Sequence, residues 1–150
     1  MTNRTPTEWR EFDQSWGTNS AYVHAQHLAL EWMSRRDRCV FCAIIRGERH
    51  AEFVRLWADA VAFVPLNPVV PGHTLVVPRV HIEDAAEDPA IAGATMARAA
   101  SLAETPFNII TSAGAQATQT VWHLHFHIIP RRENDDLALP WSGYLSGDGL

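Results

Sequence analysis

The 150-residue sequence lacks runs of Lys or Arg, long apolar stretches and internal repeats. Its formal net charge is −5 at pH 7, so it lacks the basic surface of proteins that bind nucleic acid or anionic membranes. No stretch approaches the ~18 apolar residues of a membrane-spanning helix, and the first residues lack the apolar core of a signal peptide. We therefore expect a cytoplasmic protein that binds neither a nucleic acid polymer nor a membrane.

Cysteine is also scarce, because Cys39 and Cys42 are the only two in the sequence. In a reducing compartment their C-x-x-C spacing indicates metal or redox chemistry before it indicates a structural disulfide. A redox pair is disfavoured because no thioredoxin-like βαβ pattern surrounds it. Metal binding and a pair of buried, reduced thiols remain as alternatives.

The sequence does contain 47% apolar residues, enough for one domain with a buried core. Strand-like segments follow one another as hairpins rather than as regular βαβ units, which favours an α+β fold with a largely antiparallel sheet. Asp88 followed by Pro89 predicts a helix start, and residues 1–18 are expected to form an arm without regular structure. The predicted helices are 21–36, a short one within 39–47, and 90–103; the predicted strands are 53–56, 60–64, 74–77, 107–111 and 121–129.

Three histidines, His123, His125 and His127, alternate with large apolar residues near the end of the chain. In a strand they would share one face, roughly 6.5 to 7 Å apart, while the apolar residues enter the core. Two imidazoles at that spacing can engage one phosphate, or one can bind a metal while its neighbour does not. A polar outer strand face and a three-histidine metal site are the alternative interpretations.

The segment from His123 to Ile129 resembles the H-φ-H-φ-H-φ-φ signature of the histidine triad (HIT) family. Three further segments resemble motifs of that family in the same order: Gln119–Trp122, Pro68–Pro78 and, as in the bacterial C-x-x-C branch, Cys39–Glu48. The resemblance implies a HIT-like fold, with a five-stranded antiparallel sheet, two main helices and an N-terminal helical extension. It divides the chain into an extension (1–38), a HIT domain (39–141) and a C-terminal tail (142–150).

The resemblance also implies a nucleotide hydrolase or nucleotidyl transferase that acts on a purine nucleotide. His125 would attack the α-phosphate to form a nucleotidyl-histidine, and His127 would act as acid or charge stabiliser. His73 would lie behind the triad and fix the ring tautomers. The implied contacts to phosphate, leaving group and nucleoside are Gln119, Thr120, Gly114, Asn67 and Leu66.

A structural zinc site is implied by a similarity to the related galactose-1-phosphate uridylyltransferases. There a C-x-x-C pair, a histidine after a similar strand and the first histidine of the catalytic pair bind zinc. The matching ligands in this chain are Cys39, Cys42, His81 and His123.

The chain departs from the family at Pro65, where many members have an Asp or Asn that binds the ribose. A prolyl side chain cannot do so, and Ser112 and Thr118 replace an Asn or Asp and a Gly in the loop before the triad. The nucleoside specificity therefore stays open. Dinucleoside polyphosphate hydrolysis or phosphorolysis, a slow nucleotide-binding module and a partner-binding protein are the alternatives, and a homodimer involving helix 90–103 is a further expectation.

Overall fold

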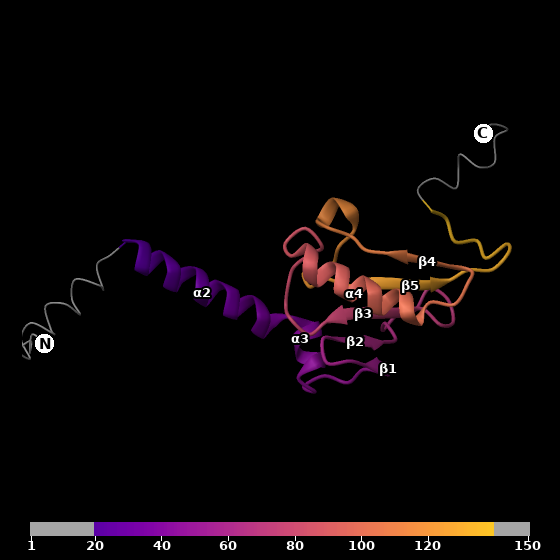
Figure 1. Ribbon diagram of the computed structural model, residues 1–150, viewed down its shortest axis with the longest axis horizontal. Coiled ribbons are helices and arrows are strands. Elements are labelled where there is room, and N and C mark those ends of the chain that lie inside the picture. Colours follow the sequence, from indigo (N-terminus) through magenta and orange to yellow (C-terminus); the bar gives the residue numbers. More distant parts are fainter. Residues whose placement is uncertain (1–19, 140–150) are drawn as a thin grey trace, which may run out of the picture. The chain divides into compact units, whose positions relative to one another are not determined.

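The computed structural model describes residues 20–139 and divides into two units, Met1–His50 and Ala51–Leu150 (Figure 1). Each unit is described by itself. The predicted N-terminal arm and C-terminal tail lie outside the described residues. Within residues 20–139, no helix has both the length and the apolar character needed to cross a membrane.

The first unit contains the predicted N-terminal helix, α2 (Ser20–Arg38), followed by the short helix α3 (Val40–Ile45). Cys39 is the N-cap of α3, and its Sγ accepts a hydrogen bond from the Cys42 N–H at 3.5 Å. The chain leaves α3 through Gly47, whose φ of +78° is a left-handed conformation that glycine adopts without strain. The C-x-x-C spacing thus forms the first turn of a helix.

The second unit contains an antiparallel five-stranded sheet with the order β1-β2-β3-β5-β4 (Figure 1). This confirms the predicted fold class. The first two strands form the predicted hairpin, and a 3₁₀ turn, η1 (Ala115–Ala117), precedes the last strand. The strands are β1 (Phe53–Leu56), β2 (Ala60–Phe63), β3 (Thr74–Pro78), β4 (Phe107–Ile110) and β5 (Phe126–Pro130).

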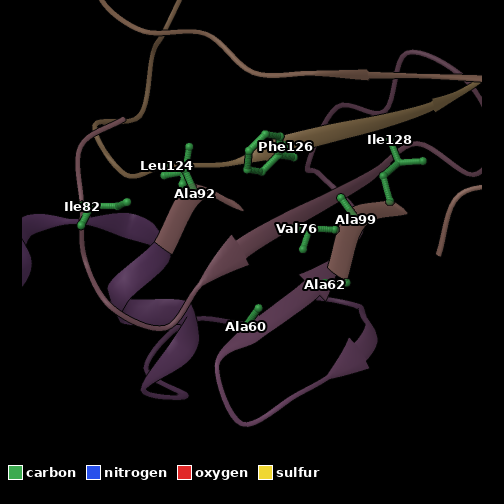
Figure 2. Packing of buried hydrophobic residues seen from close by; sticks show 9 residues of the cluster. All are labelled: Ala60, Ala62, Val76, Ile82, Ala92, Ala99, Leu124, Phe126 and Ile128. Atoms are coloured by element: carbon green, nitrogen blue, oxygen red, sulfur yellow. The ribbon is translucent and has the colours of Figure 1, made fainter. Parts of the chain in front are cut away.

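Helix α4 (Pro89–Leu102) begins as predicted, because the Asp88 carboxylate accepts hydrogen bonds from the N–H groups of Ala90 and Ile91. Its alanines belong to the same apolar cluster as side chains of β2, β3 and β5, which Figure 2 shows from close by. Small side chains let the helix lie close to the sheet. The cluster consists of Ala60, Ala62, Val76, Ile82, Ala92, Ala99, Leu124, Phe126 and Ile128.

The last strand is shorter than predicted, since β5 begins at Phe126 rather than at Val121. Only residues 126–130 have strand partners, on β3 and β4. The preceding segment uses its backbone differently: the Leu124 N–H donates to the Ile82 carbonyl and the His123 N–H to the Val121 carbonyl. Leu124, Phe126 and Ile128 are buried as predicted, but the three histidines do not share one strand face, because His123 and His125 precede β5 and are buried as well.

Candidate active site

His125 has one ring nitrogen held by the backbone. Its Nδ1 lies 2.7 Å from the His123 carbonyl oxygen, which can only accept, so Nδ1 carries the proton. In the neutral ring Nε2 is therefore unprotonated, which is the form a nucleophile needs. Burial lowers the pKa of His125 while the hydrogen bond to the His123 carbonyl opposes this, and the ring is neutral at pH 7.

His127 has the opposite tautomer, because a second chain of hydrogen bonds fixes it. The Val69 N–H donates to Nδ1 of His73 at 3.1 Å, so a neutral His73 carries its proton on Nε2. That nitrogen lies 2.9 Å from Nδ1 of His127 and donates to it. A neutral His127 is therefore protonated on Nε2, the nitrogen on the other side of the ring.

Burial, followed by the charges of His125 and His73, lowers the pKa of His127 to about 4. The ring is thus neutral at pH 7 before a substrate binds. A phosphate placed beside it would favour the charged form and raise this pKa again. The ring centroids of His125 and His127 are 5.0 Å apart, close enough for both to reach one phosphoryl group.

Strand pairing and a glycine turn bring His73 to the triad. Leu75 pairs with His127 across β3 and β5, so the residue before β3 lies beside the middle of β5. Gly72 has a φ of +84°, and a Cβ there would lie 3.1 Å from the Pro130 Cγ. The turn that presents His73 therefore requires glycine for both its conformation and its closeness to β5.

His123 is turned away from the other two triad rings toward His81. It is fully buried, its Nε2 lies 2.9 Å from the Pro78 carbonyl oxygen, and its ring meets His81 edge to face at 4.8 Å between centroids. Because the carbonyl only accepts, Nε2 carries the proton and Nδ1 does not. Metal-binding histidines commonly have this arrangement, with one nitrogen donating to a backbone carbonyl and the other bonded to the metal.

Cys39 and Cys42 are buried as a pair of thiols on the first turn of α3. Burial and the neighbouring Cys39 raise the pKa of Cys42 to about 12. A bound metal would replace the thiol proton, as it does in thiolate sites generally. Together with His81 and His123, the chain carries two buried cysteines and two buried histidines, which is the ligand set of a closed zinc site.

Gln119 is 5% exposed, and its side-chain amide is occupied by backbone groups. Its Oε1 accepts from the Gly114 N–H at 2.8 Å, and its Nε2 donates to the Glu83 carbonyl at 2.7 Å and the Val121 carbonyl at 3.2 Å. The other predicted contacts differ in exposure. Thr120 and Asn67 are exposed, Gly114 is half-buried, and Leu66 is 95% exposed.

Sequence reasoning missed the groups that support these side chains. The Val69 N–H and the Glu83 carbonyl are backbone groups, so no residue type signals them. Thr111 was also missed, although its Oγ1 donates to the His125 carbonyl at 2.8 Å. A threonine at the end of a strand occurs for too many reasons to indicate this contact.

Comparison with known proteins identifies the family to which this fold and these histidines belong. Residues 46–134 match the HIT domain, and the chain belongs to the HIT domain family. The matched segment lies within the 39–141 range expected from the sequence.

Two curated relatives and one solved structure are similar over most of the domain. Adenylylsulfatase HINT3 of Arabidopsis thaliana is 34% identical over 72% of this chain and 59% of its own length. Adenosine 5'-monophosphoramidase hnt1 of Schizosaccharomyces pombe is 30% identical over 71% of this chain and 84% of its own. The crystal structure of a zinc-bound histidine triad family protein from Mycobacterium smegmatis has a TM-score of 0.65 and 31% identity, covering 69% of this chain and 81% of that chain.

Proposed function

We propose that this protein is a hydrolase that cleaves a bond at the α-phosphate of a purine nucleotide through a covalent nucleotidyl-His125. One observation carries the proposal: His125 and His127 are adjacent and have opposite tautomers. Of two neighbouring rings, one therefore offers a lone pair and the other an N–H. A nucleophile beside a hydrogen-bond donor is what an in-line displacement at phosphorus requires.

In the first half of the reaction, Nε2 of His125 bonds to phosphorus as the bond to the leaving group breaks. His127 donates a hydrogen bond from its Nε2–H to the departing atom, which takes up a proton from solvent as it leaves. In the second half, water attacks phosphorus, the bond to His125 breaks, and the water's proton passes to solvent. The sum is hydrolysis, with both rings restored.

The class of substrate is supported by the relatives, whose names specify an adenylylsulfatase and an adenosine 5'-monophosphoramidase. We propose an adenylyl phosphoramidate or acyl or sugar nucleotide as the substrate, with a dinucleoside polyphosphate as the alternative. The exposed side chains of Leu66, Asn67 and Thr120 would contact the bound nucleotide, Thr120 at its phosphate end. Pro65 offers no ribose contact, so we expect weak discrimination against 2'-deoxynucleotides.

The test is hydrolysis of an adenylyl phosphoramidate by wild type and by His125→Ala, with His50→Ala as a matched control because His50 is exposed and outside the site. We expect loss of turnover in His125→Ala and not in His50→Ala. When the wild-type reaction is quenched without acid, mass spectrometry should detect one nucleotidyl group bound to the protein. A protein that binds AMP without turnover would instead be a nucleotide-binding module. Failure to bind any nucleotide would favour a partner-binding role.

We also propose that one zinc ion is bound by Cys39, Cys42, His81 and His123. The proton on Nε2 of His123, the buried thiol pair and the zinc-bound relative of known structure support it. The ion would hold the catalytic segment in place and take no part in the chemistry. Because both thiols must be reduced, the proposal favours a reducing compartment such as the cytoplasm.

A homodimer is supported by the β4 edge of the sheet. Among residues 20–139, β4 is an edge strand, and no described strand pairs with its outer backbone groups. Beside it an apolar cavity of about 370 Å³ lies between α4 and the sheet, lined by Ala92, Gly93, Met96, Ile109, Thr111 and Phe126. We propose that a second copy covers this face, which light scattering would detect as twice the chain mass.

We also propose that residues 39–141 form the HIT domain, that residues 1–38 are an N-terminal extension, and that residues 142–150 are a C-terminal tail.

A further inference from the structure

The family resemblance assigns Gln119 a contact with the phosphate or the leaving group, but its hydrogen bonds point to another role. Phosphate oxygens are acceptors, so a glutamine can bind them only through its two N–H donors. Both are directed at protein carbonyls, those of Glu83 and Val121. The remaining lone pair of Oε1 cannot bond to a phosphate oxygen. A direct contact would therefore break a buried hydrogen bond, at a cost of about 1–3 kcal/mol for the carbonyl left without a partner.

The same amide closes the loop that precedes the triad into a ring. The Gly114 N–H donates to the side chain of Gln119, and the backbone N–H of Gln119 donates to the Gly114 carbonyl at 3.2 Å. Between them lie η1 and Thr118, which has a φ of +67°, an uncommon conformation for a β-branched residue. A strained residue persists only where its surroundings hold it, and Gln119 is the group that closes this turn.

The other end of the amide attaches this ring to the segment behind the catalytic histidines. Glu83, which accepts from Nε2, directly follows Ile82, whose carbonyl accepts from the Leu124 N–H at 2.7 Å. Asp84 in turn accepts from the N–H groups of Ala86 and Glu87 and so fixes this segment before α4. Residues 82 and 83 thus hold both the loop and the segment that carries His125.

We propose that Gln119 is a positioning residue, whose side-chain amide clamps loop 114–118 against residues 82 and 83 and so aligns the loop with His125, without touching the substrate. This inference rests on the proposed function. In this arrangement the N–H groups of Gly114, Ala117 and Thr118 are all bonded within the loop or to Gln119 and are not offered to a substrate. Displacement of a substrate-positioning loop by about 1 Å can lower the reaction rate by about 10²-fold. A positioning residue can therefore affect turnover strongly without touching the substrate.

Two substitutions separate the clamp from a direct contact. Gln119→Met fills the same space and removes all three hydrogen bonds, whereas Gln119→Glu keeps the acceptor for Gly114 and removes the two donors. As matched control, Asn108→Leu removes another partly buried amide, whose Oδ1 accepts from Arg131 at 2.6 Å and which lies outside the site. We expect kcat/KM to fall about 10- to 100-fold in both Gln119 variants and to stay within about 3-fold of wild type in the control.

The dependence on the leaving group separates positioning of the loop from assistance to the leaving group. If Gln119 only positions the loop, the loss in Gln119→Met is the same, within about 3-fold, for adenylyl phosphoramidates of a basic alkylamine and of a weakly basic arylamine. If it assisted the leaving group, the loss would grow by more than about 10-fold for the more basic amine, since proton or hydrogen-bond donation matters most there. The second result would overturn the proposal.

A spectroscopic measurement tests the clamp without turnover. In wild type we expect slow hydrogen exchange at the Gly114 amide and at the Gln119 side-chain amide, and both should stay slow when AMP saturates the protein. In Gln119→Met the Gly114 amide should exchange at least about 10-fold faster. Deprotection of the Gln119 side chain by AMP, or unchanged Gly114 exchange in the variant, would refute the clamp. Wild type that neither binds AMP nor hydrolyses a nucleotide would instead refute the proposed function, while the exchange rates still report on the clamp.

Discussion

Two pairs of histidines lie at opposite ends of the same two paired segments, and their hydrogen bonds differ. His73 precedes β3 and meets His127, whereas His81 follows β3 and meets His123. Antiparallel pairing explains this crossing, since the residue before one strand lies beside the later part of the other. In the first pair the rings are bonded to each other, and in the second one ring is bonded to a backbone carbonyl.

That difference suits one residue type to the two roles proposed above. Where two rings share a proton, its position is set by the group at the end of the chain, here the Val69 N–H, and the pair can transfer or donate protons. Where a carbonyl binds one nitrogen, as in His123 and in His125, the other nitrogen keeps its lone pair. The partner of a ring therefore sets which nitrogen is available, and the groups beside that nitrogen favour a metal at His123 and a phosphate at His125.

The largest expected effect on turnover comes from breaking the first pair, and breaking the second pair should affect zinc content instead. His127→Ala should lower kcat/KM by about 10²- to 10⁴-fold while zinc content and thermal stability stay near wild type. His123→Ala should instead lower the zinc content and the melting temperature as its primary effects. Metal analysis, calorimetry and turnover of the same samples check this. Less than about 0.2 zinc per chain in wild type purified without chelator would contradict the metal half of the comparison.

Substitution of His73 should have a smaller effect, because His73 acts through its partner. His73→Ala removes the donor to Nδ1 of His127 and one of the charges that lower its pKa, so the pKa of about 4 should rise toward its usual range. We expect a fall in kcat of about 10-fold or more, with a pH profile shifted accordingly. His73→Gln offers a donor amide in the same place and should recover part of the loss. NMR titration of the His127 ring measures the pKa directly.

The lowered pKa of His127 also predicts a pH dependence of folding. The unfolded chain takes up a proton on this ring near its usual pKa of about 6.5, but the folded chain does so only near pH 4. The contribution of this ring to the free energy of unfolding is therefore fully present above about pH 6.5 and is lost as the pH falls toward 4. Since the ring is partly exposed, we expect a loss of about 1–2 kcal/mol rather than the full value of the shift. Urea unfolding at pH 7 and pH 4.5 checks this, and His127→Gln should show a weaker dependence.

Local sequence patterns predicted most of the fold. The strands of the first hairpin, the strand before the histidines and the cap at Asp88 came from alternation, turn residues and capping rules, which depend on near neighbours. The start of β5 was missed because β3 pairs with β5 only from Thr74 to Val76, and because the Ile82 carbonyl bonds to Leu124 from 42 residues away in sequence. Hydrogen bonds between distant segments leave no local pattern.

The candidate site shows the same limit. The motif identified His125 and His127, but their tautomers depend on the His123 carbonyl and the Val69 N–H, and every residue type offers these groups. The resemblance pointed to Gln119 without revealing that its amide bonds to three backbone groups. A motif can indicate which residues are candidates for a functional site, whereas the hydrogen-bond partners of those residues depend on the fold.

The smallest expected effect concerns the turn that presents His73, and a matched pair of glycines isolates it. Gly72 and Gly47 have nearly the same left-handed conformation, φ +84° and +78°, but an added Cβ would lie 3.1 Å from Pro130 at Gly72 and would meet nothing within 4 Å at Gly47. Each alanine substitution should cost about 1–2 kcal/mol of folding free energy from the conformation alone. Only Gly72→Ala should also press on β5 and displace His73 from His127, lowering kcat a few-fold with an intact zinc content. Equal turnover in the two variants would mean that the shared proton tolerates movement of the turn, and the tight coupling inferred for the first pair would be wrong.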